Sequence, residues 1–341
     1  MGVIGGIDGY QRRHRWLGVP LAVVYKFVDD QGSYLAALIT YYGFLSLFPL
    51  LLVMSTVLGF VLPGNPGLQQ QLIDSALSQF PIIGDQLTST AQPLRGSGFG
   101  LAIGIVVSLY GGLGVAVAVQ NALNHVWGVP INKRPDPFRA RLRSLLMLLL
   151  LSLGVLVTTV LSVLAAGAGA VGEELGVGLR LLAIVVSVAA MCGLFVLGFR
   201  ALTVRDVSVR EVLPGALLSA VAWQILQSMG AFFVSHGLMG STQVYGLFGI
   251  VLGLLAWIYI EAVIIVLAAE LNAVLGRRLY PRSLLTPFVE DVELTHADRR
   301  SYTSYASTQR FKDQQTINVQ FEPRRESSEE TGKPPLTEPE G

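Results

Sequence analysis

The chain has 341 residues, of which 52% are hydrophobic and only 14% are charged, and its formal net charge is +1. Soluble globular chains are usually about one quarter charged, and long uncharged runs account for the deficit here. The near-neutral balance favours neither a nucleic-acid partner nor an acidic one, so we expect no nucleic-acid binding. The single cysteine, Cys192, excludes an intramolecular disulfide.

Residues 1–33 have no sustained apolar core ahead of a small-residue cleavage site, so we expect no signal peptide. We interpret them as a cytoplasmic N-terminal region. Within it, residues 16–28 are typical of an amphipathic helix lying in the membrane interface, because apolar side chains accompany Arg15 and Lys26.

Residues 34–280 contain six apolar segments of the length that a helix needs to cross a bilayer, roughly 20 residues. Helix is expected because lipid offers no hydrogen-bonding partner to the backbone. The fold class predicted is therefore an all-α polytopic membrane protein with six transmembrane helices. The predicted spans cover residues 36–62, 98–120, 144–171, 179–199, 212–235 and 247–275.

Lysine and arginine alternate between the connections. The N-terminal region and the segments after spans two, four and six are rich in them, whereas 63–97, 172–178 and 236–246 are poor. By the positive-inside rule the rich side is cytoplasmic. We therefore expect an inner-membrane protein with both termini in the cytoplasm.

Span one carries Tyr42, Ser46 and Pro49 on one helical face. Proline removes a backbone donor, so we expect a kink at Pro49. This pattern favours either a broken helix lining a cavity or a packing kink with a structural hydroxyl. Residues 66–80, after this span, predict an amphipathic outer helix that packs on the bundle or the interface, or that gates a cavity.

Spans two and five carry amides. Asn121 and Asn124 share a face at the inner end of span two and either meet a polar headgroup or join neighbouring helices. Gln224 and Gln227 lie inside span five, where hydrogen bonding between helices is the simpler interpretation.

Span six holds two carboxylates. Glu261 lies near its middle, and Glu270, followed by Asn272, lies nearer the cytoplasmic end. Their spacing places the two acids on opposite faces. An ionised carboxylate at membrane depth costs at least about 2.5 kcal/mol, and no Lys or Arg lies at the depth of Glu261. Glu261 is thus interpreted as a proton or substrate site, or as a neutral structural acid.

The tail, 281–341, is polar, and we expect it to be cytoplasmic and mostly disordered; it either binds a protein partner or is simply solvated. The four histidines fall in separate regions, and the chain has neither an HExxH element nor a Walker-type glycine loop. We therefore expect no metal, no cofactor and no enzymatic activity.

Four stretches make the chain resemble the YihY/BrkB family of bacterial inner-membrane proteins. They cover residues 37–59, 121–130, 213–226 and 245–273, the last ending in AAELNA. The resemblance extends over about 15–280 and implies six helices with cytoplasmic ends. Family members have been labelled ribonuclease BN, a label that does not fit this chain, or tied to envelope integrity. Glu270 and Asn272 lie in the family motif, whereas Glu261 departs from the family pattern.

Two functional hypotheses follow. The first is a transporter or lipid-handling protein for a membrane lipid or an envelope precursor. Its cavity would be lined by Tyr42, Ser46, Pro49, Asn121, Asn124, Gln224, Gln227, Glu261, Glu270 and Asn272. The second is a non-transporting envelope-integrity scaffold that binds partner proteins through the tail and the outer helix.

Overall fold

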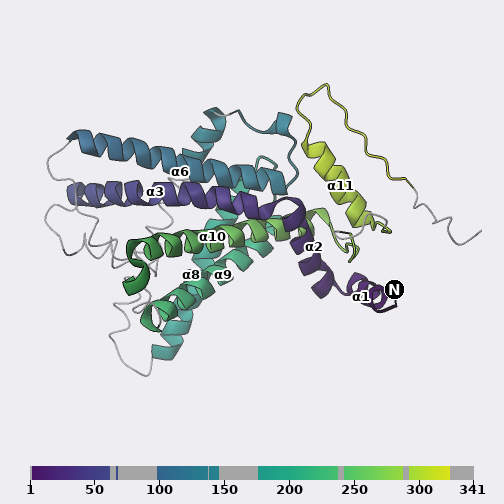
Figure 1. Cartoon of the computed structure of the whole chain (residues 1–341), viewed down its shortest axis with the longest axis horizontal. Helices are drawn as coiled ribbons and strands as arrows, with labels where there is room; N and C mark the ends of the chain where they lie inside the picture. Colours follow the sequence, from purple (N-terminus) through teal and green to yellow (C-terminus); the bar gives the residue numbers. More distant parts are fainter. Residues whose placement is uncertain are drawn as a thin grey trace, which may run out of the picture.

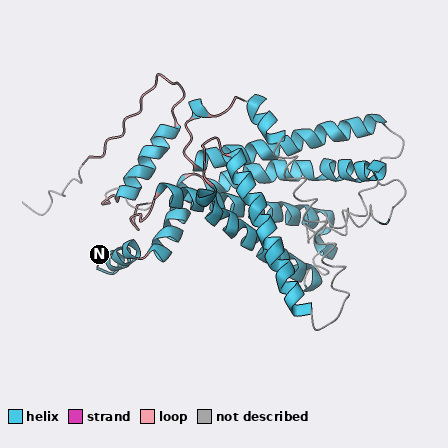
Figure 2. Ribbon diagram, turned by 180° about the vertical axis from the view of Figure 1, so that it is seen from behind, coloured by secondary structure: helices cyan, strands magenta, loops and turns pink. Residues whose placement is uncertain are grey.

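The computed structural model describes residues 2–61, 67, 98–136, 138–145, 176–236, 242–286 and 292–322. Within these residues all regular structure is helical, and none of them forms a β-strand (Figure 2). This confirms the expected all-α class for the part of the chain described.

Five of the helices that the structure describes are at least 27 residues long, which exceeds the length needed to cross a bilayer. They overlap five of the six predicted spans and are α3 (Gly32–Val61), α6 (Gly98–Val126), α8 (Gly176–Leu202), α9 (Val209–His236) and α10 (Thr242–Arg277). The predicted span 144–171 and the predicted outer helix 66–80 lie outside the described residues, apart from 144–145 and Gly67.

Three of the described segments combine the length and hydropathy of membrane spans. They lie in the last three long helices and cover Val185–Leu202, Val209–Gly230 and Val251–Arg277. A location in the membrane follows from these three apolar helices.

The long helices form two groups (Figure 1). Helices α3 and α6 lie side by side, and α8, α9 and α10 form the second group. Glycines bring α3 and α6 close together, because a Cβ on Gly111 would lie 2.8 Å from the Cα of Ser46. The groups meet where α10 packs against α3 and spread apart toward their far ends.

The groups meet at the end of the molecule that carries the positive connections, which we call the charged end. It comprises the start of α3 and α9, the end of α6, α8 and α10, and the segments attached to them. A buried apolar cluster joins these helix ends; it is formed by Leu123, Val126, Trp127, Val129, Phe199, Leu202, Val207, Val212, Ala216, Ala268, Ala269 and Ala273.

Two short helices precede α3: α1 (Gly2–Arg13) and α2 (Arg15–Asp29). Helix α2 overlaps the predicted interfacial helix 16–28 and packs on α10. Its opposite side exposes an apolar stripe of Trp16, Pro20, Val24 and Val28 at helical spacing. Its position in the membrane interface stays a prediction.

The structure differs from the expected disordered tail over residues 292–322. Helix α11 (His296–Thr308) lies beside the charged end (Figure 1). It begins with a capping box, in which Thr295 and Asp298 satisfy each other's backbone N–H groups. The polar composition suggested disorder, but buried partners of Asp298 hold this helix. Residues 323–341 lie outside the described residues.

Candidate functional site

The polar face predicted for span one lies at a helix contact. The ring of Tyr42 packs where Gly114 of α6 lacks a side chain, and Ser46 packs in the same way against Gly111. The Ser46 hydroxyl donates to the carbonyl of Gly43 at 3.0 Å. Both side chains therefore fill the α3–α6 contact. Pro49 lies within α3, whose backbone continues as helix on both sides of it, and its side chain is outside the described residues.

Two of the predicted asparagines join neighbouring segments. Asn124 is fully buried, and its Oδ1 accepts a hydrogen bond from the N–H of Val204, in the α8–α9 connection, at 2.9 Å. The Oδ1 of Asn272 accepts from the N–H of Gly215 in α9 at 2.7 Å. For Asn124, joining neighbouring segments is one of the two predicted roles; for Asn272, the contact with α9 was not predicted. Asn121, by contrast, is exposed.

Gln224 and Gln227 belong to the second helix group, on α9, and both are half-buried. Helix α9 packs on α8 and α10, whereas Tyr42 and Ser46 belong to the α3–α6 pair. The residues predicted to line one cavity are thus divided among separate helix contacts.

Glu261 faces α9 inside the span Val251–Arg277. It precedes Ala268 by seven residues, about two helical turns, so both point to the same side of α10. The carbonyl of Ala268 lies where Gly215 of α9 would carry a Cβ. Ser219 follows Gly215 by about one turn and therefore faces α10. The Glu261 and Ser219 side chains thus point into the α9–α10 contact.

Four polar side chains at this contact have a buried atom without a hydrogen-bond partner among the described residues: Ser219, Trp257, Glu261 and Asn272. Ser219 is completely buried, and its Oγ has no hydrogen-bond partner among the described residues. Glu261 Oε1 also has no hydrogen-bond partner among them. The indole N–H of Trp257, one turn away on α10, is the donor nearest to the Glu261 carboxyl group, although Trp257 Nε1 makes no hydrogen bond within 3.5 Å to a described residue. Buried polar groups in native structures nearly always have partners. This group, named the α9–α10 polar site, is therefore a candidate binding site.

Glu270 lies in a different environment. It is fully buried, and its Oε2 is 2.9 Å from the ammonium Nζ of Lys26 on α2. Lys26 also pairs with Asp30, just after α2. His125 Nε2 of α6 lies 4.0 Å from the Oδ1 of Asp30. The i,i+4 spacing of Lys26 and Asp30 indicates that pair in the sequence, but no sequence pattern links Lys26 to Glu270.

The buried cluster of Lys26, Asp30 and Glu270 holds one cation between two acids. Burial alone would lower the pKa of the Lys26 ammonium, but the two carboxylates outweigh it and raise that pKa above its usual range. The ring of Tyr305 on α11 lies 5.9 Å from Nζ. The cluster therefore joins α2, α10 and α11 at the charged end.

Arg282 fixes the start of α11. Its guanidinium is buried and pairs with Asp298 at 2.8 Å and with Asp29 at 2.6 Å. Asp298 also accepts from the N–H groups of Ser283 and Thr295, both at 3.0 Å. These bonds pair the buried charges and hold α11 against the charged end, while Arg282 Nη2 has no hydrogen-bond partner among the described residues.

The comparisons with known proteins agree with a membrane protein. The family model described as "Virulence factor BrkB" matches residues 23–288, which is more than half of the chain. The "Putative ribonuclease-like protein YfkH" of Bacillus subtilis is 26% identical over 261 residues, covering 74% of this chain and 93% of that protein. A "UPF0761 membrane protein" of Chromohalobacter salexigens is 29% identical and covers 77% of this chain and 65% of its own length.

A second "UPF0761 membrane protein", from Pseudoalteromonas atlantica, is 24% identical over 76% of this chain and 88% of its own length. No solved structure matches the chain. The family match covers all five long helices, the α9–α10 polar site and the Lys26–Asp30–Glu270 cluster. The chain therefore belongs to the virulence factor BrkB family of membrane proteins.

Proposed function

We propose that this protein transports or otherwise handles an amphiphilic lipid or envelope precursor, and that the α9–α10 polar site contacts the substrate inside the membrane. The observation that carries the proposal is the pair of unsatisfied atoms, Ser219 Oγ and Glu261 Oε1. A polar atom without a partner in an apolar environment costs on the order of 1–3 kcal/mol. A substrate hydroxyl or amide that reaches either atom would supply the missing hydrogen bond.

The proposed topology has six crossings, with the charged end in the cytoplasm of a cell whose inner membrane holds the protein. The alternation of Lys and Arg supports this orientation. The charged end gathers three positive segments: Arg143 donates to the carbonyl of Thr203 at 2.9 Å, and Arg277 to that of Trp127 at 3.2 Å.

We propose no ribonuclease activity for this chain. The word "ribonuclease-like" belongs to the name of the Bacillus subtilis relative. Among the residues that the structure describes, no three His, Cys, Asp or Glu side chains are grouped to hold a metal ion. The lipid-handling hypothesis relies instead on the polar atoms within the apolar helices.

The test compares two double variants. The polar-site variant carries Ser219→Ala and Glu261→Leu, and the control variant carries Leu217→Ala and Ile260→Ala. The control pair lies on the same two helices but is exposed on their outer faces. Native mass spectrometry of the detergent-purified protein measures co-purified lipid, and a flipping assay in proteoliposomes follows with the species found.

We expect the wild type and the control to retain the same defined species, and the polar-site variant to retain at least about tenfold less of it, a loss of about 1.4 kcal/mol. Thermal stability should be unchanged or higher in the polar-site variant, because apolar side chains replace unsatisfied groups. Equal retention by all three proteins would contradict the proposal. Loss of function on deleting 290–341 alone would instead favour the scaffold hypothesis.

A further inference from the structure

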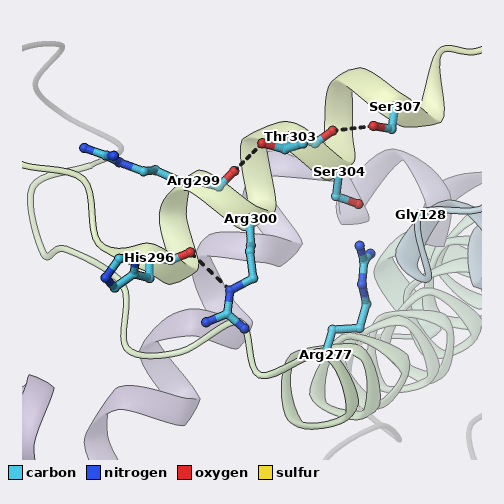
Figure 3. Close-up of a pocket in the computed structure, with 8 residues that line it drawn as sticks. All are labelled: Gly128, Arg277, His296, Arg299, Arg300, Thr303, Ser304 and Ser307. Carbon is cyan, nitrogen blue, oxygen red and sulfur yellow. Dashed lines mark hydrogen bonds between the residues drawn. The ribbon is translucent and has the colours of Figure 1, made fainter. Parts of the chain in front are cut away.

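An open groove of about 550 Å³ lies between α11 and the charged end of the membrane helices (Figure 3). One wall is α11, and the other is formed by the end of α10 and the turn after α6. The lining residues are Gly128, Arg277, His296, Arg299, Arg300, Thr303, Ser304 and Ser307.

The lining of the groove is positively charged, and the acid that acts on it, Asp30 behind Arg277, forms no ion pair with that arginine. Three of its lining residues are arginines and none is acidic. Arg282, beside the groove, is paired with two carboxylates, whereas Arg277, Arg299 and Arg300 form no ion pair with any described acidic residue. Guanidinium groups that share a concave surface and have no ion-pair partner favour an anionic ligand.

Gly128 shapes the floor of the groove. Its φ of +65° is a left-handed conformation that favours glycine. A Cβ there would lie 2.6 Å from both the Nη1 of Arg277 and the Oγ of Ser304. The absent side chain thus lets a guanidinium and a hydroxyl approach each other from opposite walls, as Figure 3 shows. Both groups donate hydrogen bonds to oxygen acceptors.

The arginines differ in how firmly they are placed. Arg277 donates to the carbonyl of Trp127 at 3.2 Å, and Arg300 donates through Nε to the carbonyl of His296 at 3.3 Å. The guanidinium carbon of Arg299 lies 5.8 Å from the ring centroid of Phe321. Each guanidinium keeps further N–H groups for a ligand, because it has five in total.

We propose that this groove binds a phosphate monoester. Such a group carries close to two negative charges and three acceptor oxygens, which match several guanidinium groups and a hydroxyl better than a single carboxylate does. The groove volume lies within the roughly 300–1,000 Å³ of small-molecule sites. Arg277 ends the span Val251–Arg277, so the groove begins at the level of lipid headgroups. The phosphate belongs either to a lipid headgroup or to a soluble molecule.

The experiment uses the full-length protein in phosphate-free buffer and two probes that share the phosphate monoester. Glycerol 3-phosphate, titrated by calorimetry, represents a soluble ligand. Phosphatidic acid in phosphatidylcholine nanodiscs, measured by native mass spectrometry, represents a lipid. The groove variant is Arg299→Gln with Arg300→Gln, both exposed. The matched control is Arg139→Gln with Arg141→Gln, also exposed and outside the groove.

We expect at least one probe to bind, the groove variant to bind it at least about tenfold more weakly, and the control to stay within about twofold of the wild type. Binding of one probe alone identifies the source of the phosphate. Binding of neither probe, or an equal loss in both variants, would overturn the proposal. The Ser219→Ala, Glu261→Leu variant should bind the probe normally, so failure of this proposal and failure of the proposed function are distinguishable.

Discussion

At the scale of single residues, the two carboxylates of α10 show how environment separates side chains of one type. Glu270 is fully buried and lies 2.9 Å from the ammonium of Lys26, whereas no described cation lies beside Glu261. The sequence predicted that the two face opposite sides of the helix, and α2 supplies a cation on the side of Glu270. The same residue type is thus structural at one position and a candidate ligand at the other.

Replacing Lys26 by methionine should be strongly destabilising. The variant leaves Asp30 and Glu270 buried without their shared cation, and breaking a buried ion pair costs about 3–5 kcal/mol. Chemical denaturation of the purified protein measures the free energy of unfolding.

The double variant Lys26→Met, Glu270→Leu is the control for the Lys26 substitution. It removes one of the two stranded acids, and Asp30 keeps His125 nearby. We expect it to be more stable than Lys26→Met alone. If both variants were equally unstable, Lys26 would act through its packing and not through its charge.

At the scale of helices, glycine positions decide which faces can approach. The carbonyl of Ala268 occupies the space that a Cβ on Gly215 would need, and the amide of Asn272 lies against the same point. Gly198 on α8, in contrast, has no atom within 4 Å of such a Cβ. The two glycines provide a matched pair.

Gly215→Ala should destabilise the protein by about 1–3 kcal/mol, because it overpacks the α9–α10 contact and displaces Asn272. Gly198→Ala should be neutral or favourable by up to about 1 kcal/mol, since alanine is the better helix former. Thermal unfolding in detergent compares the two. Equal melting temperatures would show that α9 and α10 do not pack this closely.

Helix α11 should depend on one buried carboxylate. Asp298 holds Arg282 and caps its own helix, so Asp298→Ala removes both contacts. We expect hydrogen exchange over 296–308 to become at least about tenfold faster, from a loss of more than about 1.4 kcal/mol of local stability. Arg300→Gln, on the exposed side of the same helix, should leave the exchange unchanged.

Length and hydropathy sufficed to predict the long helices, because lipid permits no other conformation for a continuously apolar run. They failed for α11, whose sequence is polar and whose order comes from Arg282, outside the helix. For Tyr42 and Ser46 they left two interpretations open. Periodicity predicted the shared face correctly but does not reveal whether that face meets a cavity or the glycines of α6.

At the scale of the whole molecule, the positive connections that alternate along the sequence meet at one end. Sequence alternation predicts on which side of the membrane each connection lies, but not which residues pair there. Lys26 reaches Glu270, and Arg205 lies over the ring of Trp127 with 5.1 Å to its centroid. These contacts depend on how the two helix groups pack, which the charge pattern alone leaves open.

Site-specific labelling tests the orientation of the whole chain. The background variant is Cys192→Ala, which removes the native cysteine. Single cysteines then replace Lys133, Arg210 or Asp313, which are exposed at the charged end. A fourth variant places the cysteine at Gly67, an exposed position after α3. By the positive-inside rule a membrane-impermeant maleimide should label the first three only in inverted vesicles and position 67 only in intact spheroplasts. Opposite labelling of Lys133→Cys and Asp313→Cys would mean an odd number of crossings between them. The groove is formed by the turn after α6 and by α11, so both must lie on the same side of the membrane. Opposite labelling would therefore contradict the fold as well as the orientation.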